Sequence, residues 1–228
     1  QYLQAVLSCP IYEGYGQTEG TAANIVQPTT CYEPGLVGIP FPVNLIKLAP
    51  VEGYKENEGE ICIKGNNITS GYYKREDLNS ELFDEEGFLK TGDIGRMVNG
   101  MFKIVGRKKD IFKTSLGEYI IPEKVEEALK GGYIEDILVV GNRYGDYVAA
   151  LVVCKDKAIS QNDILKMISG VGSQMVAKGA ITRYEVPKKI YVLRENFEHY
   201  GEFLTPTGKK KRYFIESYFK DEISALFK

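Results

Sequence analysis

"GRKKDIFKTSLGEYIIPEKVEEAL", residues 106–129, is the stretch at which the pattern of this 228-residue sequence changes. Upstream of it the sequence is rich in glycine, proline and short alternating runs, which are typical of β-strands. Inside it, Pro122 suits the first turn of a helix that carries Val125 and Leu129, and Gly131 suits its end. The stretch therefore predicts a boundary between a mainly β region and a region that mixes helices and strands.

Two runs in the first region predict strands. "GEICIKG" (59–65) alternates Ile61 and Ile63 with polar neighbours, as a half-buried strand would. "RMVNGMFKIV" (96–105) places Asn99-Gly100 between two such runs, and both turn residues tolerate positive φ. A β-hairpin is predicted there.

The second region contains alternating strand and helix signals. Buried strands are predicted over "DILVVG" (136–141), "YVAALVVC" (147–154) and "KKIYVLR" (188–194). Ser160 and Asp163 indicate a capping-box-like helix start between the last two. A final helix carries one apolar stripe, formed by Ile215, Phe219, Ile223 and Leu226. The order αββαβα predicts a small α+β domain with its helices packed on a sheet.

Composition limits the class of protein. With 43% hydrophobic and 26% charged residues, the chain is globular and long enough for one large or two modest cores. A net charge of -2 and a pI near 5.7 argue against a surface that coats nucleic acid. Four scattered cysteines and one histidine exclude a structural zinc site and fit a reducing compartment. The sequence has no apolar run long enough for a transmembrane helix.

The first stretch whose residues could bind a ligand is "YEGYGQTEGTA" (12–22). Its glycines allow the backbone to approach a ligand, and Tyr15 offers a ring face. Thr18 can donate to a phosphate, and Glu19 can hold a divalent ion. The stretch matches neither a P-loop nor GxGxxG. A glycine-rich turn with a solvated glutamate remains an alternative.

The second stretch is "GFLKTGDIG" (87–95), in which Asp93 lies between two glycines. A carboxylate in such a turn can accept both hydroxyls of a ribose, although ordinary turn chemistry explains the pattern equally well. Arg107 closes the hairpin that begins after Asp93, so its guanidinium is expected to return beside that carboxylate. A surface salt bridge is the alternative for this pair.

The third stretch is "LTPTGKKKR" (204–212), a basic run directly behind a rigid turn. On spacing alone it can be a solvated first turn of the final helix. It can also present one cation from a fixed place.

Taken together and in order, "YGQTEG", "GFLKTGD", the 106–129 stretch and "LTPTGKKKR" resemble the adenylate-forming superfamily of acyl-CoA synthetases, adenylation domains and luciferases. Residues 109–126 and "GLVGIPFPVNLIKL" (35–48) are most similar to the eukaryotic long-chain fatty acyl-CoA synthetases. The resemblance extends from about residue 8 to the end. It implies a β-rich, distorted barrel-like part of a large ATP-binding domain over 1–107, a hinge at 108–110 and a mobile α+β domain over 111–228.

The resemblance also assigns nucleotide-binding roles. Tyr15 would stack on adenine, and Thr18 would contact the nucleotide phosphate. Glu19 would bind Mg²⁺. Asp93 would accept the ribose hydroxyls, with Arg107 supporting the ribose.

Three further residues receive roles in the second region and its joint. Lys109 falls where the family pivots its mobile domain, and Gly117 falls beside the channel for the pantetheine of coenzyme A. Lys209 matches the catalytic lysine. Residues 210–212 are expected to be solvated followers of Lys209.

The implied activity is that of a long-chain fatty acid–CoA ligase, which uses ATP, Mg²⁺ and coenzyme A and proceeds through an acyl-adenylate. Two alternatives stay open: a ligase for another carboxylic acid, and a non-catalytic nucleotide-binding or scaffold relative. The family's phosphate loop precedes "YGQTEG" and is absent here, and its acyl pocket is built mostly from preceding sequence. We therefore expect the C-terminal portion of a longer enzyme, without turnover by itself. The full-length protein is expected in the cytoplasm or at the cytoplasmic face of an internal membrane. Peripheral association with a membrane is compatible with this expectation.

Overall fold

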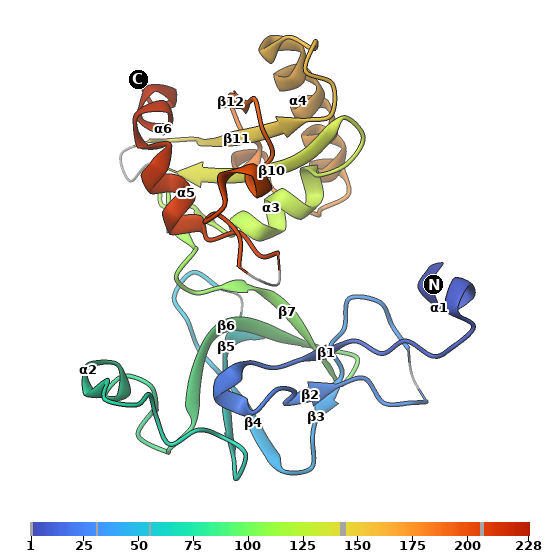
Figure 1. The fold of residues 1–228 in the computed structure, drawn as a ribbon, viewed down its shortest axis with the longest axis vertical. Helices are drawn as coiled ribbons and strands as arrows, with labels where there is room; N and C mark the ends of the chain where they lie inside the picture. The colour runs from blue at the N-terminus through green and yellow to red at the C-terminus, as the bar shows by residue number, and fades with distance from the viewer. Residues whose placement is uncertain (1, 31, 55, 142–144, 206–207) are drawn as a thin grey trace. The chain divides into compact units, whose positions relative to one another are not determined.

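A computed structural model describes residues 2–30, 32–54, 56–141, 145–205 and 208–228. The chain divides into two compact units, Gln1–Lys109 and Asp110–Lys228 (Figure 1). The α+β class predicted from the sequence is confirmed. The division falls inside the 108–110 segment that the resemblance names as a hinge, and bending at this segment stays a prediction.

The first unit is built mainly from short antiparallel strands. Its elements are α1 (Tyr2–Leu7), β1 (Gly14–Tyr15), the 3-10 turn η1 (Thr18–Gly20), β2 (Ile25–Val26), β3 (Ile39–Pro40), β4 (Asn44–Ala49), β5 (Glu58–Gly65), α2 (Glu76–Asn79), β6 (Leu89–Val98) and β7 (Met101–Arg107). They form a sheet in the order β1-β2-β3 and a second sheet in the order β4-β5-β6-β7. The described residues form these separate sheets and no closed barrel. The first unit is therefore β-rich, as expected, but it is not a barrel.

Two features of the larger sheet can be compared with the sequence. The predicted hairpin is present, since Asn99 (φ 51°) and Gly100 (φ 78°) both take positive φ between β6 and β7. The strand predicted at 59–65 is present as β5, but the expectation that it is half-buried is wrong. In β5, residues 59–63 are all buried, because β5 lies between β4 and β6 and both of its faces are covered.

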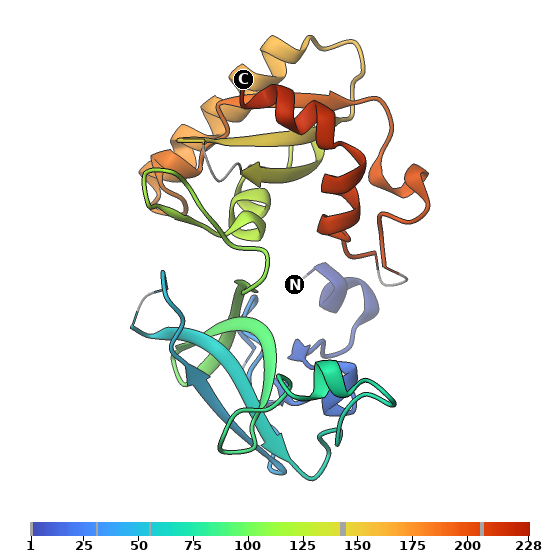
Figure 2. The same ribbon diagram turned by 90° about the vertical axis from the view of Figure 1, so that its left-hand side faces the viewer.

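The second unit is a sheet with helices on both faces (Figure 2). Its elements are β8 (Phe112–Lys113), β9 (Tyr119–Ile120), α3 (Pro122–Leu129), β10 (Ile134–Gly141), β11 (Val148–Cys154), α4 (Gln161–Ala177), η2 (Arg183–Glu185), β12 (Lys189–Leu193), η3 (Phe197–Tyr200), α5 (Arg212–Tyr218) and α6 (Lys220–Leu226). The sheet order is β10-β11-β12, with β10 antiparallel and β12 parallel to the central β11.

The strand period of two divides the core of this unit. Alternate residues such as Ile137 and Val139 pack with α3 and α4, whereas Leu138 and Val140 pack with the aromatic residues and helices of the chain's end. All of β11 is buried, as expected for a central strand covered on both sides. The capping start of α4 is also found, because the Ser160 hydroxyl accepts from the Asp163 amide.

The single C-terminal helix predicted from the apolar stripe is wrong. Phe219 (φ −93°, ψ 25°) separates α5 from α6. The stripe itself is buried as expected, with Ile215 fully enclosed and Phe219 packed against the rings of Tyr200 and Phe203. Among the described residues, no helix has both the length and the apolar character needed to cross a lipid bilayer.

Candidate nucleotide-binding site

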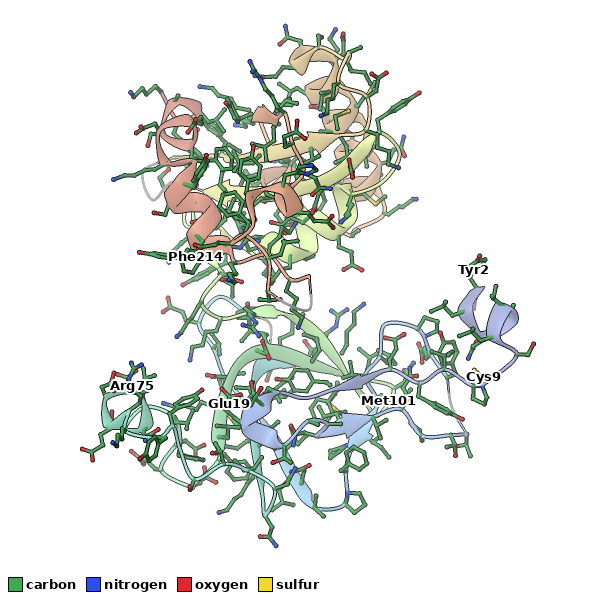
Figure 3. All side chains as sticks on the ribbon, in the orientation of Figure 1. Tyr2, Cys9, Glu19, Arg75, Met101 and Phe214 are labelled. Carbon is green, nitrogen blue, oxygen red and sulfur yellow. The ribbon has the colours of Figure 1, made fainter. Side chains whose placement is uncertain are left out.

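The "YGQTEG" stretch forms a compact turn after β1. A Cβ on Gly16 would lie 1.6 Å from the carbonyl oxygen of Ala22, so only glycine fits there. The close packing of the turn is therefore sufficient to explain this glycine, without a bound ligand. Thr18 is exposed, and Glu19, labelled in Figure 3, lies on η1 and accepts a hydrogen bond from the Tyr72 hydroxyl. The Glu19 carboxylate raises the pKa of Tyr72 to about 12, together with partial burial.

Side-chain amides hold this turn in place. The side-chain amides of Asn24 and Asn67 both donate to the Gly20 carbonyl at 3.0 Å. Asn44 donates to Asn67 at 2.7 Å, and the Thr69 amide donates to the carbonyl of Glu19 at 2.8 Å. These hydrogen bonds hold the backbone of Glu19 and Gly20 in place, so Thr18 and Glu19 lie on a fixed turn.

Asp93 is the centre of a second cluster. Its carboxylate is buried on β6 and lies opposite Arg107 of β7 in the strand register. The Tyr15 hydroxyl donates to Oδ2 at 2.6 Å, and Arg107 Nε lies 3.0 Å from Oδ1. Burial and the Asp93 carboxylate both raise the pKa of Tyr15, so its hydroxyl remains a donor. The structure thus brings together three residues from three different strands.

A buried glutamate supports Asp93 from the neighbouring strand. Glu60 of β5 accepts from the Gly92 amide at 3.0 Å and pairs with Lys108 Nζ at 2.7 Å. The Lys108 amide in turn donates to the Gly92 carbonyl at 2.8 Å. One carboxylate therefore ties the Asp93 turn to the segment that leads out of the unit.

Glu19 can be weighed as a ligand for Mg²⁺. Within the described parts of the chain, no group of three His, Cys, Asp or Glu side chains could hold a metal ion. Mg²⁺ commonly uses only one or two carboxylates and takes its other ligands from water and substrate phosphates. A half-buried carboxylate next to an exposed threonine fits that role as a single protein ligand.

Lys109 and Gly117 lie at exposed positions. Lys109 is the last residue of the first unit. Gly117, with φ 86°, lies in the turn that joins β8 and β9 and donates its amide to the Thr114 carbonyl at 2.9 Å. The structure does not test their predicted roles as pivot and channel residue.

Lys209 is exposed, and its amide donates to the Thr205 hydroxyl at 3.0 Å. Pro206 and Thr207, the middle of the predicted rigid turn, lie outside the described residues. The expectation that residues 210–212 are solvated is wrong for two of them. The side chains of Lys210 and Arg212 are only 19% and 11% exposed and are paired with carboxylates.

Sequence reasoning missed the supporting residues of both clusters. Tyr72 and Glu60 are distant in sequence from the residues they contact, and neither lies in a motif that indicates ligand binding. The burial of Lys210 and Arg212 was not predictable from spacing, because Lys209 and Lys211 are also spaced by two.

Known proteins resemble this chain along nearly its whole length. The family profile described as "AMP-binding enzyme" matches residues 1–73. Long-chain-fatty-acid–CoA ligase 1 of Homo sapiens is 36% identical over 249 residues, which cover 99% of this chain and 36% of that protein. Fatty acyl-CoA synthetase B of Dictyostelium discoideum is 35% identical over 251 residues, which cover 99% of this chain and 37% of that protein. The chain thus spans little more than a third of the length of these relatives.

A solved structure agrees with this result. The A domain of the carboxylic acid reductase from Segniliparus rugosus, in complex with AMP and a co-purified carboxylic acid, has a TM-score of 0.83 and 26% identity. The match covers 99% of this chain and 36% of that one. By its sequence motifs, its relatives and its fold, the chain belongs to the adenylate-forming superfamily of AMP-binding enzymes.

Proposed function

We propose that this chain is part of a long-chain fatty acid–CoA ligase, which converts a fatty acid, ATP and coenzyme A to acyl-CoA, AMP and pyrophosphate. The observation that carries the proposal is the identity of about 35% to such ligases along 99% of the chain. In the first half-reaction the fatty acid carboxylate attacks the α-phosphorus and pyrophosphate leaves. In the second, the thiol of coenzyme A attacks the acyl carbon and AMP leaves.

The Asp93 cluster supports a role in holding the ribose. A carboxylate offers about four lone-pair sites, and Tyr15 and Arg107 each use one, on different oxygens. About one site per oxygen then remains. This is the number that the two hydroxyls of a ribose need. Because Tyr15 is anchored through its hydroxyl, its ring is fixed in place and can act as a platform for adenine.

Thr18 and Glu19 would lie toward the phosphates. An exposed threonine hydroxyl can donate to a phosphate oxygen, and the Glu19 carboxylate would hold Mg²⁺ as one protein ligand. When bound, Mg²⁺ would neutralise part of the phosphate charge. Glu19 must then exchange the Tyr72 hydroxyl for the metal, and Tyr72 would keep the carboxylate oriented until that exchange.

Lys209 would act in the first half-reaction. Attack of a carboxylate on a phosphate brings two anions together, and a cation between them favours the transition state over the separated reactants. Lysine suits delivery by a moving domain, because its compact charge lies on a flexible stem. Gly117 would serve the second half-reaction, with Lys109 as the pivot between the two arrangements.

A ligase for another acid is the second candidate, favoured by the solved structures that match the fold. They include O-succinylbenzoate coenzyme A synthetase of Bacillus subtilis, with a TM-score of 0.70 and 26% identity. The acid therefore has to be determined by assay. Fatty acids of several chain lengths and o-succinylbenzoate should be compared in a pyrophosphate-release assay of the full-length protein.

Release that is strongest with long-chain fatty acids would support the proposal, and preference for another acid would replace it by the second candidate. Absence of release with every acid, combined with retained ATP binding, would favour a non-catalytic relative. The 228-residue chain alone serves as a control. We expect it to bind ATP weakly and to release no pyrophosphate, because the family's phosphate loop precedes the motifs present here.

We also propose a cytoplasmic location, or one at the cytoplasmic face of an internal membrane, for the full-length protein. Cys62 and Cys154 are free and buried, which suits a reducing compartment. Fractionation of cells with and without a high-salt wash would separate a free protein from a peripherally bound one.

A further inference from the structure

The basic run that begins at Lys209 has two different faces. The Leu204 and Lys210 backbones form an antiparallel bridge, and the Lys211 amide donates to the Phe203 carbonyl at 2.7 Å. The Thr205 amide also donates to the Lys209 carbonyl at 2.8 Å. The run is therefore one arm of a tight loop, and its side chains alternate. Lys209 is exposed, whereas Lys210 turns into the unit.

Glu126 of α3 is the common partner of the inward face. Its carboxylate lies 2.6 Å from Arg212 Nη2 and 3.4 Å from Lys210 Nζ, and it accepts from the Val139 amide at 2.8 Å. Lys210 Nζ also lies 2.9 Å from Asp136 Oδ1. These groups form a connected set of opposite charges. We call Glu126, Lys210 and Arg212 the Glu126 clamp.

The clamp also completes the edge of the sheet. β10 is an edge strand, so its outward backbone groups lack a partner strand. Lys210 donates to the Ile137 carbonyl at 2.6 Å, and Arg212 donates to the Val139 carbonyl at 2.8 Å. The two basic residues are spaced by two, as are the two carbonyls. Because the two spacings match, the edge of β10 can bind both basic side chains of the segment that follows Lys209.

The charge of Arg212 is maintained in this setting. Burial alone would lower the pKa of Arg212, but Glu126 and Asp110 together raise it. Asp110 lies 3.9 Å from Arg212 Nε and is the first residue of the second unit. Removing one partner of the closest pair would leave the other without its nearest opposite charge, so Glu126 and Arg212 hold each other in place.

α5 has an apolar anchor that is separate from the clamp. Ile215 and Phe219 belong to the same buried cluster as Leu151 and Leu193, on the face of the sheet opposite α3. The helix therefore has its own apolar anchor, and the clamp is left to set the path of the chain just before it.

We propose that the Glu126 clamp fixes the backbone at Lys209, so that Glu126, Lys210 and Arg212 are positioning residues for the adenylation half-reaction. This inference rests on the proposed function. A lysine side chain is long and flexible, so its useful reach depends on where its backbone is held. Because every member of the clamp lies in the second unit, it moves with Lys209 as one body. Loss of the clamp should weaken adenylation selectively.

The first test measures the loop itself in the 228-residue chain. Lys210→Met removes one cation and leaves the Arg212–Glu126 pair intact, so the variant should fold. Hydrogen exchange at the Thr205, Lys209 and Lys211 amides should become at least about tenfold faster, while β11 amides remain protected. Lys211→Met is the matched control, since Lys211 places its ammonium over the Phe214 ring instead of in the clamp. Equal hydrogen-exchange rates at these amides in the two variants would overturn the proposal that the clamp holds the loop.

The second test separates the half-reactions in the full-length protein. In Lys210→Met, ATP–pyrophosphate exchange should fall about 10- to 100-fold in kcat with little change in the KM for ATP, because misplacement of about 1 Å costs up to this much. Thioester formation from supplied acyl-adenylate should stay within about twofold of wild type. Lys210→Arg keeps the charge and should recover most of the exchange.

The double variant Glu126→Gln/Arg212→Met removes both partners of the closest pair and should show the same selective loss. Equal loss of both half-reactions would overturn the inference in favour of a general structural role. A wild-type protein without pyrophosphate exchange would overturn the proposed function instead. The hydrogen-exchange comparison would then still decide whether the clamp holds the loop.

Discussion

Replacing Asp93 with asparagine should weaken the binding of ATP while leaving the fold almost unchanged. The carboxylate has one oxygen directed at the Tyr15 hydroxyl and the other at Arg107 Nε. Asparagine can keep its oxygen toward Arg107 and turn its amide nitrogen toward Tyr15, because a tyrosine hydroxyl accepts as well as donates. The cost in unfolding free energy should therefore be about 1 kcal/mol. The lost charge adds little, since Arg107 is 57% exposed.

The cost in nucleotide binding follows from the same geometry. The amide nitrogen has no lone pair for the ribose hydroxyl that the carboxylate oxygen would have accepted. One hydrogen bond to a charged acceptor is worth about 1.5–3 kcal/mol. At about 1.4 kcal/mol per factor of ten, the affinity for ATP should fall about 10- to 100-fold.

The assay is calorimetric titration of the full-length protein with ATP and with 2′,3′-dideoxy-ATP. The dideoxy nucleotide lacks the two hydroxyls, so its affinity should change less than about twofold between wild type and Asp93→Asn. Glu58→Gln is the matched control, because Glu58 is equally buried, pairs with Arg96 in the same sheet and lies outside the Asp93 cluster. Equal losses for both nucleotides would refute ribose recognition by Asp93.

Three further predictions concern the second unit and its joint. Lys209→Ala in the full-length protein should abolish ATP–pyrophosphate exchange but spare thioester formation from supplied acyl-adenylate; surviving exchange would show that another cation acts. Lys109→Pro should fix φ at the joint and impair one half-reaction while the other persists, whereas equal loss of both would indicate misfolding. Asp136 supplies a pH test: burial alone would raise its pKa, but Lys210 lowers it below the ordinary 3.8. A lowered pKa stabilises the fold above the ordinary value and ceases to do so as the pH falls through the lowered one. Urea unfolding should therefore show Asp136→Asn as less stable than wild type at pH 7, with a difference that shrinks below about pH 4.

Local patterns were enough to predict much of the fold. The Asn99-Gly100 turn allowed its hairpin to be predicted, because positive φ at both positions is a local property. The continuous apolar run of β11 likewise indicated a buried strand. The kink at Phe219 was not predictable, since it occurs where the ring packs against Tyr200 and Phe203, which come from another segment.

The site was predictable to the extent that strand pairing is local. Asp93 and Arg107 face each other because one hairpin register joins them. The contact of Tyr15 with Asp93 spans 78 residues, and only the family resemblance linked the two segments. Helical periodicity could not indicate that Glu126 is buried with charged partners, because Lys210 and Arg212 lie 84 and 86 residues later in the chain.

The distance in sequence between Tyr15 and Asp93 also determines when the proposed adenosine site can form. Bringing together residues 78 positions apart requires a long loop to close, and contacts of this kind form slowly compared with local ones. During synthesis the pair cannot exist until β6 has emerged, after almost the whole first unit has been made. The loop around Lys209 needs only residues that are neighbours in the chain and a sheet that is already complete. Nucleotide binding at Asp93 would therefore report that at least residues 15–93 of the first unit have been made and have folded together.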